Sequence, residues 1–152
     1  MPFRNIFKKI LFYTNFSEHD EKAFFYALNI AEGNPDSELI IFHVIPEPDA
    51  QFWKSYLYEV EEIDEKAHHD IDAKIDHSYL KHIPEGIKWT KQIVIGHVDQ
   101  KLLETADTAQ ADLIILGRQG SSSFGSKFLG DFTEHIARKS PCPVLIIPEK
   151  AR

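Results

Sequence analysis

The chain contains 152 residues, of which 43% are hydrophobic and 27% charged, with a formal net charge of −7. This balance excludes a disordered chain and favours a single globular domain spanning residues 1–152. The acidic charge argues against nucleic acid as the main partner. The longest apolar stretch is far below the ~18 residues that cross a bilayer, so we expect no membrane partner. The single cysteine, Cys142, excludes an internal disulfide framework, and we expect a small cytoplasmic protein.

Strand-like and helix-like segments alternate from the start of the chain. The apolar run at residues 9–14 predicts a strand that is buried on both faces. Ser17 is a good N-cap and acidic residues follow it, so a helix is predicted from there to Gly33. The run at 39–45 predicts a second buried strand, closed by Pro46.

The second half of the chain continues this alternation. Apolar residues at steps of three or four predict a long helix from Tyr56 to Ile75, which stops before residues 84–86. The remaining elements are predicted as strand, helix, strand, helix and strand at residues 89–95, 98–109, 113–116, 131–139 and 144–147. Because strands alternate with helices, the fold class is α/β, a three-layer α/β/α sandwich with a five-stranded parallel sheet. Ligands in such sheets bind at the carboxyl ends of the strands.

A glycine-rich loop follows the fourth predicted strand, from Gly117 to Gly130, and it holds four of the seven glycines. Glycine lets the backbone approach a ligand closely, and the loop leads into a helix N-terminus that favours an anion. Arg118 and Lys127 add positive charge. The loop therefore predicts a phosphate site. It is not a Walker A loop, since Ser126 stands where the lysine belongs.

The spacing of Gly117, Gly120 and Gly130 resembles the nucleotide-binding signature of the universal stress protein family. The segments 10–18, 111–117 and 140–148 look like the first, fourth and last strands of that family, in the same order. The resemblance implies an adenine-nucleotide-binding, Rossmann-like sheet, a homodimer paired through the last strand, and a role in stress response or signalling. Many members bind ATP, and most are not known as efficient enzymes.

The resemblance also implies positions for the nucleotide. Thr14 and Asn15 would lie near adenine and ribose, and Val44 would line the adenine pocket. The phosphates would meet the glycines of the loop, Arg118, Lys127 and the backbone of Asp131 and Phe132. The dimer strand would comprise Val144, Leu145, Ile146 and Ile147.

Two residues depart from the family pattern. The usual aspartate after the first strand is Asn15, which keeps a hydrogen-bond acceptor but loses the charge. The usual phosphate-binding serine or threonine is Asp131, whose repulsion of a phosphate about 4 Å away would cost about 4 kcal/mol near a surface. Asp131 and Glu134 fit a capping box, in which Asp131 is the N-cap. A Mg²⁺ ion bridging Asp131 and a polyphosphate is a second reading of that residue.

Other polar groups give weaker signals. His68, Asp72 and Asp76 share one helical face, which could start a metal site but is more typical of a solvated surface. We expect His43 to be a hydrogen-bonded, partly buried side chain and His97 to be a turn or cap residue. Cys142 is assigned to packing. The aromatic residues between 52 and 58 are assigned to core cover or to a protein contact patch.

Two alternatives to a nucleotide-binding dimer remain open. The first is a protein-interaction dimer of the same family that has lost its nucleotide, which Asn15 and Asp131 favour. The second is a slow ATP hydrolase or self-phosphorylating enzyme, for which Ser121, Ser122 and Ser123 are candidate acceptors. No base–nucleophile pair supports rapid turnover, and no catalytic residue is assigned.

Overall fold

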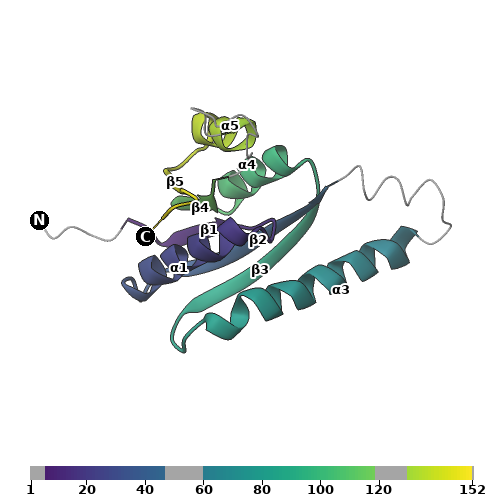
Figure 1. Ribbon diagram of the computed structural model, residues 1–152, viewed down its shortest axis with the longest axis horizontal. Coiled ribbons are helices and arrows are strands. Elements are labelled where there is room, and N and C mark those ends of the chain that lie inside the picture. Colours follow the sequence, from purple (N-terminus) through teal and green to yellow (C-terminus); the bar gives the residue numbers. More distant parts are fainter. Residues whose placement is uncertain (1–5, 47–59, 119–129, 152) are drawn as a thin grey trace, which may run out of the picture.

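The computed structural model describes residues 6–46, 60–118 and 130–151 and has a central parallel sheet between two helical layers (Figure 1). Its elements in chain order are β1 (Lys9–Tyr13), α1 (Glu18–Glu32), β2 (Glu38–Pro46), α3 (Val60–Ser78), η1 (Leu80–His82), β3 (Lys88–Gly96), α4 (Val98–Thr108), β4 (Leu113–Gly117), α5 (Asp131–Lys139) and β5 (Val144–Ile147). The predicted α/β class and the alternation of elements are confirmed.

The sheet has five strands in the order β3-β2-β1-β4-β5, and all four pairs are parallel. The central strands β1, β2 and β4 are almost continuously buried, as their apolar runs predicted. The chain adds β2 and β3 on one side of β1, then crosses to add β4 and β5 on the other. The direction of winding therefore reverses between β1 and β4.

One apolar cluster fills each side of the sheet. The first packs α1 and the end of α3 against the sheet through residues such as Phe12, Phe24 and Ile75. The second packs α4 and α5 against the opposite side through residues such as Leu102 and Ile136. Alternate residues of each strand serve the two clusters, because successive side chains point to opposite faces.

The helix boundaries agree with the sequence signals wherever the structure describes them. Ser17 is the N-cap of α1 and Gly33 its C-cap, as predicted. The third predicted strand and the two final elements also agree with β3, α5 and β5. The long helix is described from Val60 onward and ends in the short η1 turn, whereas its predicted start at Tyr56 lies outside the described residues. None of the described helices is long and apolar enough to span a membrane.

Candidate functional site

The crevice at the carboxyl ends of β1 and β4 is the candidate site, because the sheet winding reverses between these two strands. The segment after β1 turns into α1 on one face of the sheet, and the segment after β4 leads toward α5 on the other. In parallel α/β sheets, such a reversal of winding is where ligands commonly bind. Arg118 follows β4 directly and donates its backbone N–H to the Ile147 carbonyl at 2.9 Å, which fixes the start of that loop.

A buried carboxylate organises the turn between β1 and α1. Asp20 is fully buried, and its Oδ2 accepts the backbone N–H groups of Asn15 at 2.8 Å and Ser17 at 3.3 Å. The Thr14 hydroxyl also donates to Oδ2, at 3.1 Å. Burial raises the pKa of Asp20, while these hydrogen bonds oppose the rise. Asp20 therefore fixes the backbone of the turn between β1 and α1 through these hydrogen bonds.

Thr14 is also fully buried, and its hydroxyl has three partners. Besides donating to Asp20, it lies 2.5 Å from the Tyr79 hydroxyl, and it accepts the Phe16 N–H at 2.9 Å. Burial raises the pKa of the Tyr79 phenol, so this group stays protonated. The Thr14 hydroxyl is therefore used entirely within the turn. Because Thr14 is buried, a ligand at this place would contact its neighbours and not its side chain.

Phe16 adopts a left-handed conformation, with a φ of 64°, that non-glycine residues rarely take. Its ring lies 4.8 Å from the His43 ring and 6.1 Å from the Tyr79 ring, measured between centroids, and the ammonium of Lys74 sits 4.7 Å from its centre. These contacts hold the strained residue in place. Phe16 thus links the turn to α3.

His43 is 8% exposed and places its Nδ1 2.7 Å from the Thr14 carbonyl oxygen. A carbonyl only accepts, so Nδ1 carries the proton and donates. Burial lowers the pKa of His43, which keeps the ring neutral. The expectation that His43 is a hydrogen-bonded, buried side chain is confirmed.

Gly117, at the end of β4, lies against the start of α1. A Cβ at this position would come within 3.0 Å of the His19 carbonyl oxygen and 3.1 Å of Asp20 Oδ1. These distances are shorter than most carbon–oxygen contacts, so any larger residue would push the His19 backbone or Asp20 aside. The β4 end and the β1–α1 turn are therefore packed together through Asp20.

The opposite wall of the crevice is the start of α5. The N-cap is Gly130, with a φ of 89°, and the helix begins at Asp131. The predicted capping box is wrong, because Asp131 occupies the first helical position rather than the N-cap and Glu134 the fourth. The Glu134 N–H instead donates to the Gly130 carbonyl at 2.9 Å. Glycine was already present to take the positive φ, which left no cap role for Asp131.

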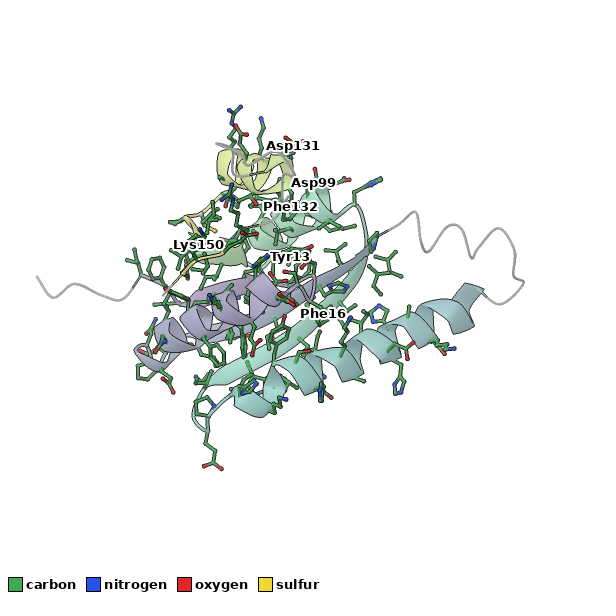
Figure 2. The ribbon with its side chains drawn as sticks, in the orientation of Figure 1. Tyr13, Phe16, Asp99, Asp131, Phe132 and Lys150 are labelled. Carbon is green, nitrogen blue, oxygen red and sulfur yellow. The ribbon has the colours of Figure 1, made fainter. Side chains whose placement is uncertain are left out.

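Asp131 is exposed at this helix start, above an aromatic pair (Figure 2). Phe132 packs its ring 5.3 Å from that of Tyr13, and Tyr13 is 4% exposed. Burial raises the pKa of the Tyr13 phenol well above its usual range, and the nearby Asp20 charge adds to the rise. The pair packs the start of α5 against the end of β1.

Comparison with known proteins decides the family. The model of the "Universal stress protein family" matches residues 6–148. The chain belongs to the universal stress protein family.

Individual members resemble the chain over nearly its whole length. It is 27% identical to universal stress protein MJ0577 of Methanocaldococcus jannaschii, covering 95% of this chain and 97% of that protein. It is 28% identical to a universal stress protein of Thermus aquaticus, covering 93% and 99%. The solved structure of MJ0577 superposes with a TM-score of 0.79 over 97% of this chain and 100% of that one. A universal stress protein solved in complex with cAMP superposes with a TM-score of 0.61 at 23% identity, over 95% and 98% of the two chains.

Within this universal stress protein fold, the structure brings four of the predicted site residues together. Thr14, Asn15 and Gly117 meet around Asp20, and Phe132 reaches them through Tyr13. Val44 is 1% exposed near the end of β2, within the cluster that faces α4. Gly120 and Lys127 lie outside the described residues, as do the three serines and the aromatic residues between 52 and 58.

The sequence reasoning missed four residues that build the turn and the crevice: Tyr13, Phe16, Asp20 and Tyr79. Asp20 carried a usable signal, because it stands three residues after the N-cap Ser17, at the spacing of a capping box. Tyr79 carried none, since 59 residues separate it from Asp20. The polar helix face away from the site has a different role. Asp72 and Asp76 both contact Lys91, at 2.6 and 2.8 Å, which ties α3 to β3.

Proposed function

We propose that this universal stress protein binds an adenine nucleotide in the crevice between β1 and β4 and acts as a small cytoplasmic regulator in stress response or signalling. The supporting observation is the reversal of sheet winding between β1 and β4, flanked by a polar turn on one side and a helix N-terminus on the other. We propose no catalytic turnover at this crevice.

The residues present fit the two ends of a nucleotide unequally. The β1–α1 turn offers the exposed Asn15, whose amide can hydrogen-bond a ribose hydroxyl or a base. The first turn of α5 offers backbone N–H groups and the positive end of the helix dipole to phosphate. Asp131 at the same helix start opposes a bare polyphosphate. We therefore propose that phosphate binding depends on Mg²⁺, which takes both carboxylate and phosphate oxygens.

Calorimetry with ATP, with and without Mg²⁺, tests this function. The wild-type protein should bind Mg-ATP and bind metal-free ATP at least tenfold more weakly, equivalent to about 1.4 kcal/mol. Asp131→Ser should remove most of that difference. Asp36→Ser is a matched control, because Asp36 is an exposed acid in the α1–β2 turn, at the opposite end of the sheet. Tight metal-free binding that Asp131→Ser leaves unchanged would refute the role of Asp131.

We also propose a homodimer paired through β5. This strand is at one edge of the sheet, and Val144, Leu145 and Ile146 are only half-buried. Exposed apolar edge strands are usually covered or paired, and a second copy supplies such a partner. Light scattering should give twice the chain mass, and Val144→Lys should reduce it, whereas Trp89→Lys at the other edge strand should not.

A nucleotide-free protein-interaction dimer is the second candidate, and Asn15 together with the exposed Asp131 favours it. Mass spectrometry of small molecules released from the denatured protein separates the two. A stoichiometric adenine nucleotide supports the first function. An empty protein that also fails to bind Mg-ATP supports the second. A slow hydrolase would instead release phosphate above background over time.

A further inference from the structure

The charge at the β1–α1 turn has an unusual position. The exposed tip of the turn carries the uncharged Asn15, and the carboxylate of Asp20 lies buried beneath it. The two side chains converge on one donor, since Asn15 Oδ1 lies 3.0 Å and Asp20 Oδ2 3.3 Å from the Ser17 backbone nitrogen. An acid at position 15 would therefore bring two negative charges to one N–H group.

The Thr14 hydroxyl fixes the direction of the hydrogen bonds below the turn. A hydroxyl has one proton and two lone pairs. The proton goes to the Asp20 carboxylate, and one lone pair accepts the Phe16 N–H. The remaining lone pair must accept from Tyr79, so the Tyr79 hydroxyl is a donor. The hydrogen-bonding capacity of Thr14 is then fully used.

This chain of bonds connects α3 to the ligand side of the turn. Tyr79 follows the last residue of α3, is 3% exposed and packs edge-on against Phe12 with centroids 5.3 Å apart. Its ring is also stacked with that of Phe16, so it acts on the turn through both its hydroxyl and its face. Figure 2 shows Phe16 between the sheet and α3, on the side of Tyr13 away from α5.

We propose that Asp20 and Tyr79 are positioning residues of the nucleotide site, which together hold the β1–α1 turn through Thr14 and require an uncharged residue at position 15. The inference rests on the proposed nucleotide function. It adds that the family's usual carboxylate at position 15 is replaced in this chain by the buried carboxylate of Asp20. The charge of Asp20 therefore requires an uncharged side chain at position 15, and a charge change at either residue alone should weaken nucleotide binding.

A hydroxyl deletion tests the role of Tyr79. Tyr79→Phe removes only the donor, and we expect a loss of Mg-ATP affinity of about three- to tenfold, the value of one hydrogen bond. Thr14→Val should lose a similar factor, and the double variant should lose no more than the larger single change. Tyr26→Phe is the control, because Tyr26 is a 37% exposed tyrosine on α1. If Tyr79→Phe lowers the unfolding midpoint but leaves Mg-ATP affinity unchanged, its role is merely structural and the proposal fails.

A charge exchange tests Asp20 and Asn15 together. Asn15→Asp should weaken Mg-ATP binding at least tenfold, because two carboxylates then compete for the Ser17 N–H. The exchange variant Asn15→Asp/Asp20→Asn should recover affinity to within about threefold of the wild type. Wild-type affinity in Asn15→Asp, or no recovery in the exchange variant, would overturn the proposal.

Failure of the function and failure of the inference are distinguishable. If the wild-type protein does not bind Mg-ATP, the proposed function is refuted, and amide hydrogen exchange then reports on the turn directly. In that case Tyr79→Phe should still speed exchange at the Asn15 and Ser17 amides about tenfold and leave Ile114 in β4 unchanged. Equal exchange in both proteins would refute the positioning role itself.

Discussion

The two walls of the crevice are built in opposite ways. The β1–α1 turn is held by a buried carboxylate, a hydroxyl whose hydrogen-bonding capacity is fully used, and the stacked rings of Phe16 and Tyr79. The start of α5 has a glycine cap and an exposed carboxylate. Each wall contains one aspartate, and the two aspartates differ in almost every respect: Asp20 is fully buried, whereas Asp131 faces solvent.

This contrast indicates a division of work between the walls. A turn fixed in advance loses little conformational entropy when a ligand binds, so its contribution is positioning. A helix start that faces solvent keeps its dipole and its N–H groups accessible, so its contribution is electrostatic. Loss of one carboxylate should therefore lower the stability of the fold more at the β1–α1 turn than at the start of α5.

The largest expected effect follows removal of Asp20. Asp20→Ala leaves the Asn15 N–H group and the Thr14 hydroxyl without the acceptor that Asp20 provides, whereas the Ser17 N–H keeps Asn15 Oδ1. A buried group without a partner costs about 1–3 kcal/mol, and release of the buried charge offsets part of the sum. We expect a loss of about 3 kcal/mol in the free energy of unfolding, measured by urea denaturation. A loss below about 1 kcal/mol would show that the turn does not depend on this carboxylate.

The fold was largely predictable from the sequence, and the two walls show why the site was less so. Buried strands and the α1 cap depend on neighbouring residues, so the run at 9–14 and Ser17 were sufficient to locate them. The N-cap of α5 was wrongly assigned to Asp131, because the neighbouring Gly130 takes that position. The bond between Tyr79 and Thr14 spans 65 residues and depends on how α3 packs, which no local pattern encodes.

The second prediction concerns the contact between the end of β4 and the start of α1. Gly117→Ala should lower the free energy of unfolding by about 1–3 kcal/mol, because the new methyl group would overlap the His19 carbonyl and Asp20. Gly33→Ala is the matched control. Gly33 has a φ of −72°, and a Cβ there would meet its nearest atom at 3.6 Å, so we expect a gain of about 0.4–1 kcal/mol. Similar losses in both variants would mean that the close approach at Gly117 is not tight.

The third prediction uses the pH dependence of the turn. His43 is neutral in the folded protein because its pKa is lowered, so the unfolded chain binds more protons below the usual pKa of about 6.5. Stability should fall as pH drops below that value, with a slope of at most about 1.4 kcal/mol per pH unit for one proton. Asp20 acts oppositely: its raised pKa means that its contribution to stability falls as pH rises above the usual carboxyl range.

The difference in unfolding free energy between the wild type and a His43 variant isolates the contribution of the histidine. His43→Asn keeps an N–H group near the position of Nδ1 and removes the titration. Urea denaturation of both proteins between about pH 7.5 and about pH 5, a range that brackets the usual histidine pKa of about 6.5, should give a stability difference that shrinks on acidification. His82, exposed at the end of η1, provides the control substitution His82→Asn. A pH-independent difference for His43→Asn would show that the ring titrates normally in the fold.

The smallest effect on stability is expected for Asp131 at the start of α5. Comparing the sign of the change in stability with the sign of the change in ATP affinity shows the role of this residue. A carboxylate in the first turn of a helix stabilises it by about 0.3–1 kcal/mol, so Asp131→Asn should lower the free energy of unfolding by that amount. The same substitution should strengthen binding of metal-free ATP, because the repulsion disappears. Opposite signs from one variant would mean that Asp131 neutralises the helix dipole in place of a bound phosphate. If Asp131→Asn weakens both stability and metal-free binding, the carboxylate supports the ligand, and the electrostatic contrast between the two walls is wrong.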